Sequence, residues 1–264
     1  MLAWDIFKKA VLLIFDNIAA ALRISLVPYG LLVAVNLYFL DSLAPMAMLQ
    51  SGDATALETL PSGFFGSILL TVAVQVFVFI WIAVAWHRYV LLEEGGNAWV
   101  PQMNGGHMLG YLGRSILLGL LILAALIAIT VAIGFIMPFA AVALSGLVSI
   151  ILVYRLGLIL PAGAVGKPIT MGEAWEASKG HSTTVVLLAI ITFIASLMLQ
   201  IPTAVDAVLS GAVDPASDPA QALEATTSPV SLVYNLVINW IVLVVGVSIL
   251  STLYGHFVEG RPLD

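Results

Sequence analysis

The sequence predicts an all-α fold: a polytopic membrane helical bundle of six transmembrane helices with an N-terminal amphipathic interfacial helix. Of the 264 residues, 61% are apolar and only 9% are charged, whereas a soluble domain carries about 25% charged residues. Six stretches are long and apolar enough to cross a hydrocarbon core about 30 Å thick. The composition excludes a soluble enzyme, and the net charge of −6 excludes a nucleic-acid-binding protein.

The first element is an amphipathic lead over residues 1–23, predicted as one helix from residue 2 to residue 22. Its apolar face consists of side chains at helical spacing, namely Phe7, Val11, Ile14, Ile18 and Leu22. Such a helix lies in the cytoplasmic interface, with Lys8 and Lys9 near anionic headgroups. Two roles remain open: a lead-in helix that sets the orientation of the chain, or a helix that senses a lipid or a partner.

Six spans follow within a single membrane domain of residues 1–264, at about 24–43, 64–86, 115–136, 139–162, 183–201 and 230–254. Pro138 predicts a tight turn that joins the third and fourth spans into a hairpin. Small residues at intervals of four predict that the two helices of this hairpin pack face to face: Ala124, Ala128 and Ala132 on one, and Ala141, Ser145 and Ser149 on the other. Between the fourth and fifth spans, Thr170 and Glu173 match a capping box that begins a short helix.

Positive charge predicts the orientation of the chain. All nine Lys and Arg residues fall on the side of the N- and C-termini, which the positive-inside rule places in the cytoplasm. The two long loops on the other side carry acidic residues instead: Asp41, Asp53, Glu58, Asp206, Asp214, Asp218 and Glu224. The acidic loops are therefore expected to face the periplasm or the exterior, and a bacterial inner membrane is the expected location. An aromatic belt at the inner boundary is expected from Trp86, Tyr89, Tyr111, Tyr154 and Tyr254.

Polar side chains inside the spans are the most informative candidates for a site. The fifth and sixth spans, run antiparallel, would place Gln200 near Ser231, Ser196 near Asn235 and Thr192 near Asn239. An unpaired amide in hydrocarbon costs several kcal/mol, so these groups must face each other or water. Two interpretations stay open: hydrogen bonds between helices, or a polar cavity open to the exterior that binds a headgroup. The candidate cavity residues are Asn36, Gln75, Thr192, Ser196, Gln200, Asn235 and Asn239.

Basic residues at the inner boundary are candidates for contact with lipid headgroups. Arg155 lies about 24 Å along its helix from Phe139, close to the inner interface. It is expected either to bind a lipid phosphate or to serve a transport path. The candidate headgroup contacts are Lys8, Lys9, Arg88 and Arg155.

No pattern in the chain indicates catalysis or a cofactor. The sequence has no cysteine, no HExxH motif and no phosphate-binding loop. Ser145 lies in the outer half of its span, whereas all four histidines fall on the inner side, so no nucleophile meets a base. We expect no catalytic, cofactor-binding or metal-ligating residue, and no enzyme activity.

Two short motifs carry a resemblance to a known family. Leu160, Pro161 and Ala162 follow Arg155, and the stretch Met171-Gly172-Glu173-Ala174-Trp175-Glu176-Ala177-Ser178 precedes the fifth span. With the six-span layout, these residues resemble the YciC-type inner-membrane family and the membrane domain that precedes some glycerophosphoryl diester phosphodiesterases. The resemblance implies the six-span fold and a lipid-adjacent context, without hydrolysis, because no phosphodiesterase barrel is present.

The expected function is a non-enzymatic binding, scaffolding or accessory role in envelope or lipid processes. The alternative is a small transporter, or a carrier of a lipid or another hydrophobic ligand, which uses the outward-facing polar cavity and Arg155. The expected partners are membrane lipids, with a membrane-protein partner or a second copy of the chain left open and nucleic acid excluded.

Overall fold

The structure is a computed structural model that describes residues 1–39, 60–95, 98–134, 136–209 and 229–263. Within these ranges the regular elements are all helical. In chain order they are α1 (Leu2–Asp16), α2 (Ile18–Tyr38), α4 (Phe64–Leu92), α5 (Gly105–Ile129), the π-helical turn η3 (Thr130–Gly134), α6 (Pro138–Leu156), α7 (Ile159–Ala164), α8 (Met171–Lys179), α9 (Ser182–Leu209) and α11 (Pro229–Phe257).

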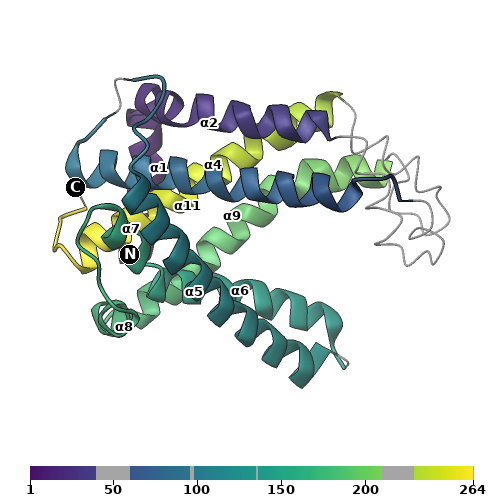
Figure 1. Ribbon diagram of the computed structural model, residues 1–264. Helices are drawn as coiled ribbons and strands as arrows, with labels where there is room; N and C mark the ends of the chain where they lie inside the picture. The colour runs from purple at the N-terminus through teal and green to yellow at the C-terminus, as the bar shows by residue number, and fades with distance from the viewer. Residues whose placement is uncertain (40–59, 96–97, 135, 210–228, 264) are drawn as a thin grey trace.

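The predicted fold class is confirmed. Among the described residues, six helical segments are long and apolar enough to cross a membrane: α2, α4, α5 with η3, α6, α9 and α11. Both ends of the chain lie at the same end of the bundle, and the hairpin of α5 and α6 diverges from the other spans at its far end (Figure 1). The chain is therefore a multi-pass membrane protein. The end at which both termini lie is called the terminal end below, and the opposite end the far end.

The spans differ from their predicted bounds where a helix continues beyond the hydrocarbon or breaks inside it. Helix α5 begins at Gly105 instead of residue 115, and α9 runs to Leu209 instead of residue 201. The predicted fourth span, 139–162, is two helices, because α6 ends at Leu156 and the short α7 begins at Ile159. All six residues of α7 are buried.

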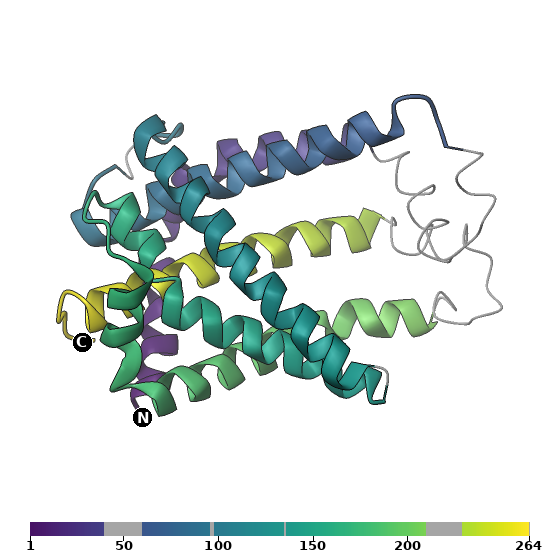
Figure 2. The same cartoon turned by 60° about the horizontal axis from the view of Figure 1, so that its bottom comes forward.

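The predicted lead helix is wrong in its length and in its buried face. Helix α1 ends at Asp16, and Asn17 separates it from α2. The Asn17 side chain holds the bend between the two helices: its amide donates to Leu13 O (2.9 Å), and its Oδ1 accepts from the Tyr89 hydroxyl (2.9 Å). Residues 18–22 therefore belong to the first span. The helix lies across the terminal end of the bundle (Figure 2) and packs on α9 and α11. Those contacts select a different buried face: Ala3, Ile6, Ala10 and Ile14.

The core of the protein lies in the half of the bundle at the terminal end. There α4 and α11 bury nearly every side chain from Ile80 to Val84 and from Val247 to Tyr254. The prediction of an aromatic belt at the inner boundary is wrong for four of its five residues, because Trp86, Tyr111, Tyr154 and Tyr254 are buried inside the bundle. Trp86 Nε1 donates to Ser248 Oγ (2.8 Å), so polar pairing inside the protein replaces the expected contact with headgroups.

The hairpin of α5 and α6 forms at the predicted turn, with Pro138 as the first residue of α6. The predicted face-to-face packing of small residues is wrong, because Ala124, Ala128 and Ala132 are exposed. Larger side chains of α5 take the inner face instead: Leu118 is buried and Ile122 packs against the core.

The capping box that begins α8 is confirmed. Glu173 N donates to Thr170 Oγ1 (3.2 Å), and Thr170 N donates to the Glu173 carboxylate (2.6 Å). The backbone hydrogen bond from Thr170 holds the pKa of Glu173 below its ordinary value. The ionised carboxylate therefore supports the start of α8 above the ordinary carboxyl titration range, and this support is lost as the pH falls through the lowered pKa.

Candidate ligand pocket between α2, α4 and α11

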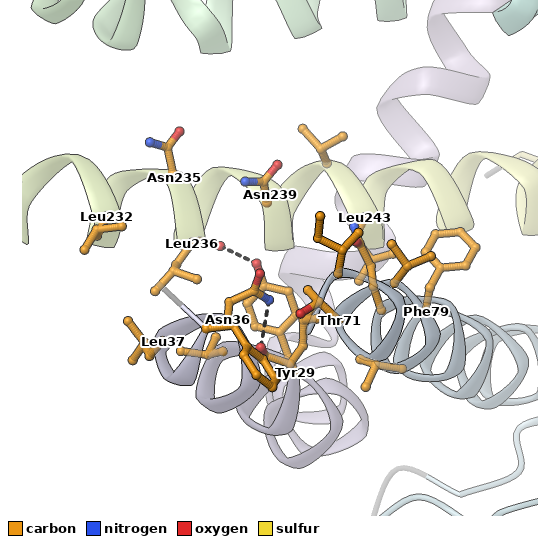
Figure 3. A pocket seen from close by; sticks show the side chains of 18 of the residues that line it. Tyr29, Asn36, Leu37, Thr71, Phe79, Leu232, Asn235, Leu236, Asn239 and Leu243 are labelled. Atoms are coloured by element: carbon orange, nitrogen blue, oxygen red, sulfur yellow. Dashed lines mark hydrogen bonds between the residues drawn. The ribbon is translucent and has the colours of Figure 1, made fainter. Parts of the chain in front are cut away.

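A pocket of about 620 Å³ lies between the far halves of α2, α4 and α11. Its walls are mainly aliphatic and aromatic side chains, and Figure 3 shows it from close by. Polar groups from all three helices interrupt this lining: Tyr29, Asn36, Ser67, Thr71, Gln75, Asn235 and Asn239. A mostly apolar hollow with a few polar groups is the usual composition of a small-molecule site.

The pocket extends from the far end of the bundle towards its middle. Its lining on α4 runs from Ser67 to Phe79, which is about 18 Å at 1.5 Å per residue. On α11 it runs from Leu232 to Leu243, about 16 Å. Beyond Phe79 and Leu243 the helices enter the packed core, so the pocket is closed towards the terminal end.

Two hydrogen bonds shape the side of the pocket formed by α2. The Tyr29 hydroxyl donates to Leu236 O (2.8 Å) and so ties α2 to α11 across the lining. About two turns further along α2, the Asn36 amide donates to Leu32 O (2.8 Å). Figure 3 shows both bonds, with Asn36 above the α2 ribbon and close to Leu236 and Thr71. Helix α2 therefore presents one amide whose position is held by its own backbone.

The two asparagines of α11 lie at the rim of the pocket. Figure 3 shows Asn235 and Asn239 on the edge of α11 that points away from Asn36, whereas Leu236 and Leu243 point towards α2 and α4. Asn235 is half-buried and Asn239 is exposed. The polar groups thus lie on two sides of an apolar centre, which suits a ligand with an apolar body and a polar group.

The structure brings together four of the seven predicted cavity residues and leaves three outside. Asn36, Gln75, Asn235 and Asn239 line the pocket. The other three lie on α9 and have partners of their own: Thr192 Oγ1 accepts from the Tyr154 hydroxyl (2.9 Å), Ser196 Oγ donates to Thr192 O (2.8 Å), and Gln200 Oε1 accepts from Thr203 (3.2 Å).

The predicted register between the fifth and sixth spans is wrong. Tyr234 donates to Leu199 O (2.7 Å), and Ser231 Oγ donates to Asp206 Oδ2 (2.9 Å) rather than lying opposite Gln200. Relative to the predicted alignment, the partner on α9 lies two residues further along for Tyr234 and six residues further along for Ser231. The two polar faces consequently do not meet as pairs.

The candidate headgroup contacts fall into two groups. Arg88 donates to Ala164 O (2.9 Å) and pairs with Glu94, and the Arg155 guanidinium lies 4.4 Å above the Trp175 ring and donates to Ser182 Oγ. Both arginines are therefore engaged within the protein. Lys8 and Lys9 lie on α1, where Lys8 is exposed.

Tyr29, Ser67 and Thr71 line the pocket although the sequence analysis did not single them out. A signal for them exists in the helical period. Ser67, Thr71 and Gln75 recur at intervals of four, and Tyr29 precedes Asn36 by seven, so each set shares one face. A search for polar residues at helical spacing within the first two spans would have found them.

The lining of the pocket is suited to an amphiphile. Its hydroxyl and amide groups can hydrogen-bond to ester, phosphate or hydroxyl oxygens, and its apolar walls suit acyl chains. Among the residues that the structure describes, no three His, Asp or Glu side chains gather into a group that could hold a metal ion. No protein-family model, curated protein or solved structure matches this chain.

Proposed function

We propose that this protein is a non-enzymatic, amphiphile-binding protein of a bacterial inner membrane, which holds a lipid or another hydrophobic ligand in support of an envelope or lipid process. One observation carries the proposal: a largely apolar pocket of about 620 Å³ gathers amide side chains from three helices. Pockets that hold small ligands have volumes of roughly 300–1,000 Å³ and the same composition.

The closed end of the pocket favours holding a ligand over transporting it. A transporter needs an alternative opening on the opposite side of the membrane. Here the half of the bundle at the terminal end is filled by buried side chains such as Trp86, His87 and Ser251, and His87 Nδ1 lies 2.8 Å from Ser251 Oγ. This packing supports a binding role, with transport as the less favoured alternative.

The distribution of charge supports an orientation in which the pocket opens to the outside of the cell. All nine Lys and Arg residues belong to α1 or to segments at the terminal end, and the positive-inside rule assigns that end to the cytoplasm. The acids expected on the opposite side are Asp206, at the far end of α9, and six that lie outside the described residues: Asp41, Asp53, Glu58, Asp214, Asp218 and Glu224. The resemblance to the YciC-type family agrees with a lipid-adjacent role.

A bulky substitution inside the pocket tests the proposal. Thr71 lies on the α4 wall between Ser67 and Gln75, so Thr71→Trp places an indole in the space of the ligand. Purified protein in lipid nanodiscs is photolabelled with a phospholipid that carries a diazirine on its acyl chain. We expect labelled peptides from α2, α4 and α11, and about tenfold less labelling of these helices in Thr71→Trp, which corresponds to about 1.4 kcal/mol.

The control is Leu117→Trp, which adds the same side chain to an exposed position on α5 outside the pocket. This variant is expected to label like the unchanged protein. Labelling spread evenly over all lipid-exposed helices, and equal in the two variants, would contradict a binding pocket.

A further inference from the structure

Three basic side chains converge on one turn of α7 at the terminal end of the bundle. Arg88 of α4 donates to Ala164 O (2.9 Å), and His107 Nδ1 of α5 lies 3.3 Å from Gly163 O. The Arg114 guanidinium of α5 lies against Gly163 itself, since a Cβ on this glycine would be 2.3 Å from Arg114 Nη1. Two consecutive residues of α7 are thus surrounded by three cationic or potentially cationic groups.

Glycines make room for Arg114 on both sides. A Cβ on Gly110, one helical turn before Arg114, would lie 2.9 Å from the same Nη1 atom. With Gly163 on α7, this leaves the guanidinium between two backbones that carry no side chain. The position of the charge is therefore defined by packing against α5 and α7.

Arg114 is half-buried, yet it makes no hydrogen bond or ion pair with any residue that the structure describes. Arg88, although it has two acceptors, retains a buried Nε without a partner beside the same turn of α7. Arg114 beside Gly163 and Arg88 beside Ala164 thus keep N–H donors without an acceptor among the described residues, and an anion at this turn of α7 would satisfy them.

The depth of Arg114 points to phosphate as that anion. From Arg114 to Gly134, α5 and η3 rise about 30 Å at 1.5 Å per residue. This length equals the thickness of the hydrocarbon core, which puts Arg114 at the level of the headgroup phosphates of one leaflet. The planar fork of an arginine matches two phosphate oxygens, so the residue type fits the ligand.

We infer that Arg114, flanked by Arg88 and His107, binds a phosphate group against the last turn of α7. The phosphate belongs either to the headgroup of an anionic phospholipid or to free inorganic phosphate. This site lies at the opposite end of the bundle from the pocket between α2, α4 and α11, and it does not depend on the function proposed for that pocket.

The test is a calorimetric titration, in a non-ionic detergent, of the purified full chain carrying Thr71→Trp, which fills the pocket between α2, α4 and α11 and leaves the site at α7 unchanged. The probes are dihexanoyl-phosphatidylglycerol, inorganic phosphate, and dihexanoylglycerol as a probe without phosphate. Arg114→Gln is expected to weaken binding of the phosphate-bearing probe by about tenfold or more, because a charge-assisted pair is lost. Binding of phosphatidylglycerol alone assigns the site to lipid, whereas equal binding of inorganic phosphate assigns it to free phosphate.

Arg155→Gln is the matched control, because it removes the same charge at a similar depth from a guanidinium already engaged with Trp175 and Ser182. We expect its affinity for the phosphate-bearing probe to stay within about twofold of that of the chain with Thr71→Trp alone. Arg114→Lys, which keeps the charge but loses the fork, serves if Arg114→Gln does not fold, and it too is expected to bind more weakly. The inference is overturned if the chain with Thr71→Trp alone binds neither phosphate-bearing probe, if it binds dihexanoylglycerol equally well, or if the Arg114 and Arg155 variants lose the same affinity.

Discussion

Replacement of Trp86 by alanine is expected to lower the free energy of unfolding by about 3–5 kcal/mol. Trp86 is 1% exposed, and its indole Nε1 donates to Ser248 Oγ across the interface of α4 and α11. The substitution leaves a large cavity in the best-packed half of the bundle and removes the partner of a buried hydroxyl. Chemical unfolding of the purified protein in detergent, followed by circular dichroism, measures the change.

Trp99→Ala is the control for this experiment, since Trp99 is 59% exposed and the Arg23 guanidinium lies 5.9 Å from its ring. Its expected cost is below about 1 kcal/mol. Equal effects of the two substitutions would mean that the core does not lie at the terminal end. A loss of unfolding free energy confined to Trp86→Ala supports the claim that the packed core closes the pocket at the terminal end. The preference for binding over transport depends on that claim.

Replacement of Gly157 by alanine is expected to cost about 3 kcal/mol. This glycine joins α6 to α7, and a Cβ there would lie 2.2 Å from Val153 O and 3.2 Å from Leu250 Cδ2. The carbonyl oxygen has little freedom to move, because Gly157 N donates to it (2.8 Å). The backbone between α6 and α7 must therefore change conformation, and α7 must move out of its buried position.

Gly119→Ala provides the comparison, because a Cβ at this position in α5 meets no atom within 4 Å. Alanine is favoured over glycine in a helix by about 1 kcal/mol, so this variant is expected to be as stable as the unchanged protein or slightly more stable. The melting temperatures of the two variants in detergent make the comparison. If Gly157→Ala melts like Gly119→Ala, α6 and α7 form one continuous helix, as the predicted span 139–162 implied.

The features that the sequence predicted well depend on local or one-dimensional signals. Hydropathy over about 20 residues identifies a span regardless of its neighbours, and all six spans were found. The capping box of Thr170 and Glu173 is likewise contained within four residues. The hairpin turn at Pro138 followed from a residue that begins helices more readily than it continues them.

The features that the sequence predicted poorly depend on which helix faces pack against each other. A tyrosine or tryptophan near the end of a span suits either a headgroup layer or a buried hydrogen bond, and hydropathy does not distinguish them. Trp86 and Tyr111 were therefore expected in an aromatic belt, whereas the structure buries both. The end of α1 at Asn17 likewise depends on Tyr89, which is distant in sequence and becomes a neighbour only in the folded bundle.

Only part of the candidate site was predicted, because the rest also depends on which helix faces pack against each other. Amides inside a span must find partners or water, which singled out Asn36, Gln75, Asn235 and Asn239. The choice of neighbours was wrong for α9, because Ser231 of α11 bonds to Asp206 rather than lying opposite Gln200, and no α9 residue lines the pocket. Helix α4, with Thr71 and Gln75, takes the place that the sequence analysis assigned to α9.

The central claim is that the pocket between α2, α4 and α11 opens to the outside of the cell, and thiol labelling tests it most directly. The chain has no cysteine, so each engineered thiol is unique. Asn239→Cys lies about 15 Å along α11 from its start at Pro229, near the middle of the membrane. Val237→Cys is the matched control on the same helix, because Val237 is exposed but does not line the pocket. Ser62→Cys, exposed just before α4, is the accessible reference.

Intact cells that express each variant are treated with a small membrane-impermeant maleimide, and the labelled fraction is measured over time. The account predicts that Asn239→Cys reacts at a rate close to that of Ser62→Cys, while Val237→Cys stays unlabelled. If Asn239→Cys is as unreactive as Val237→Cys while Ser62→Cys reacts, no water-filled pocket opens to the outside, and the amides of α11 serve only to hold helices together.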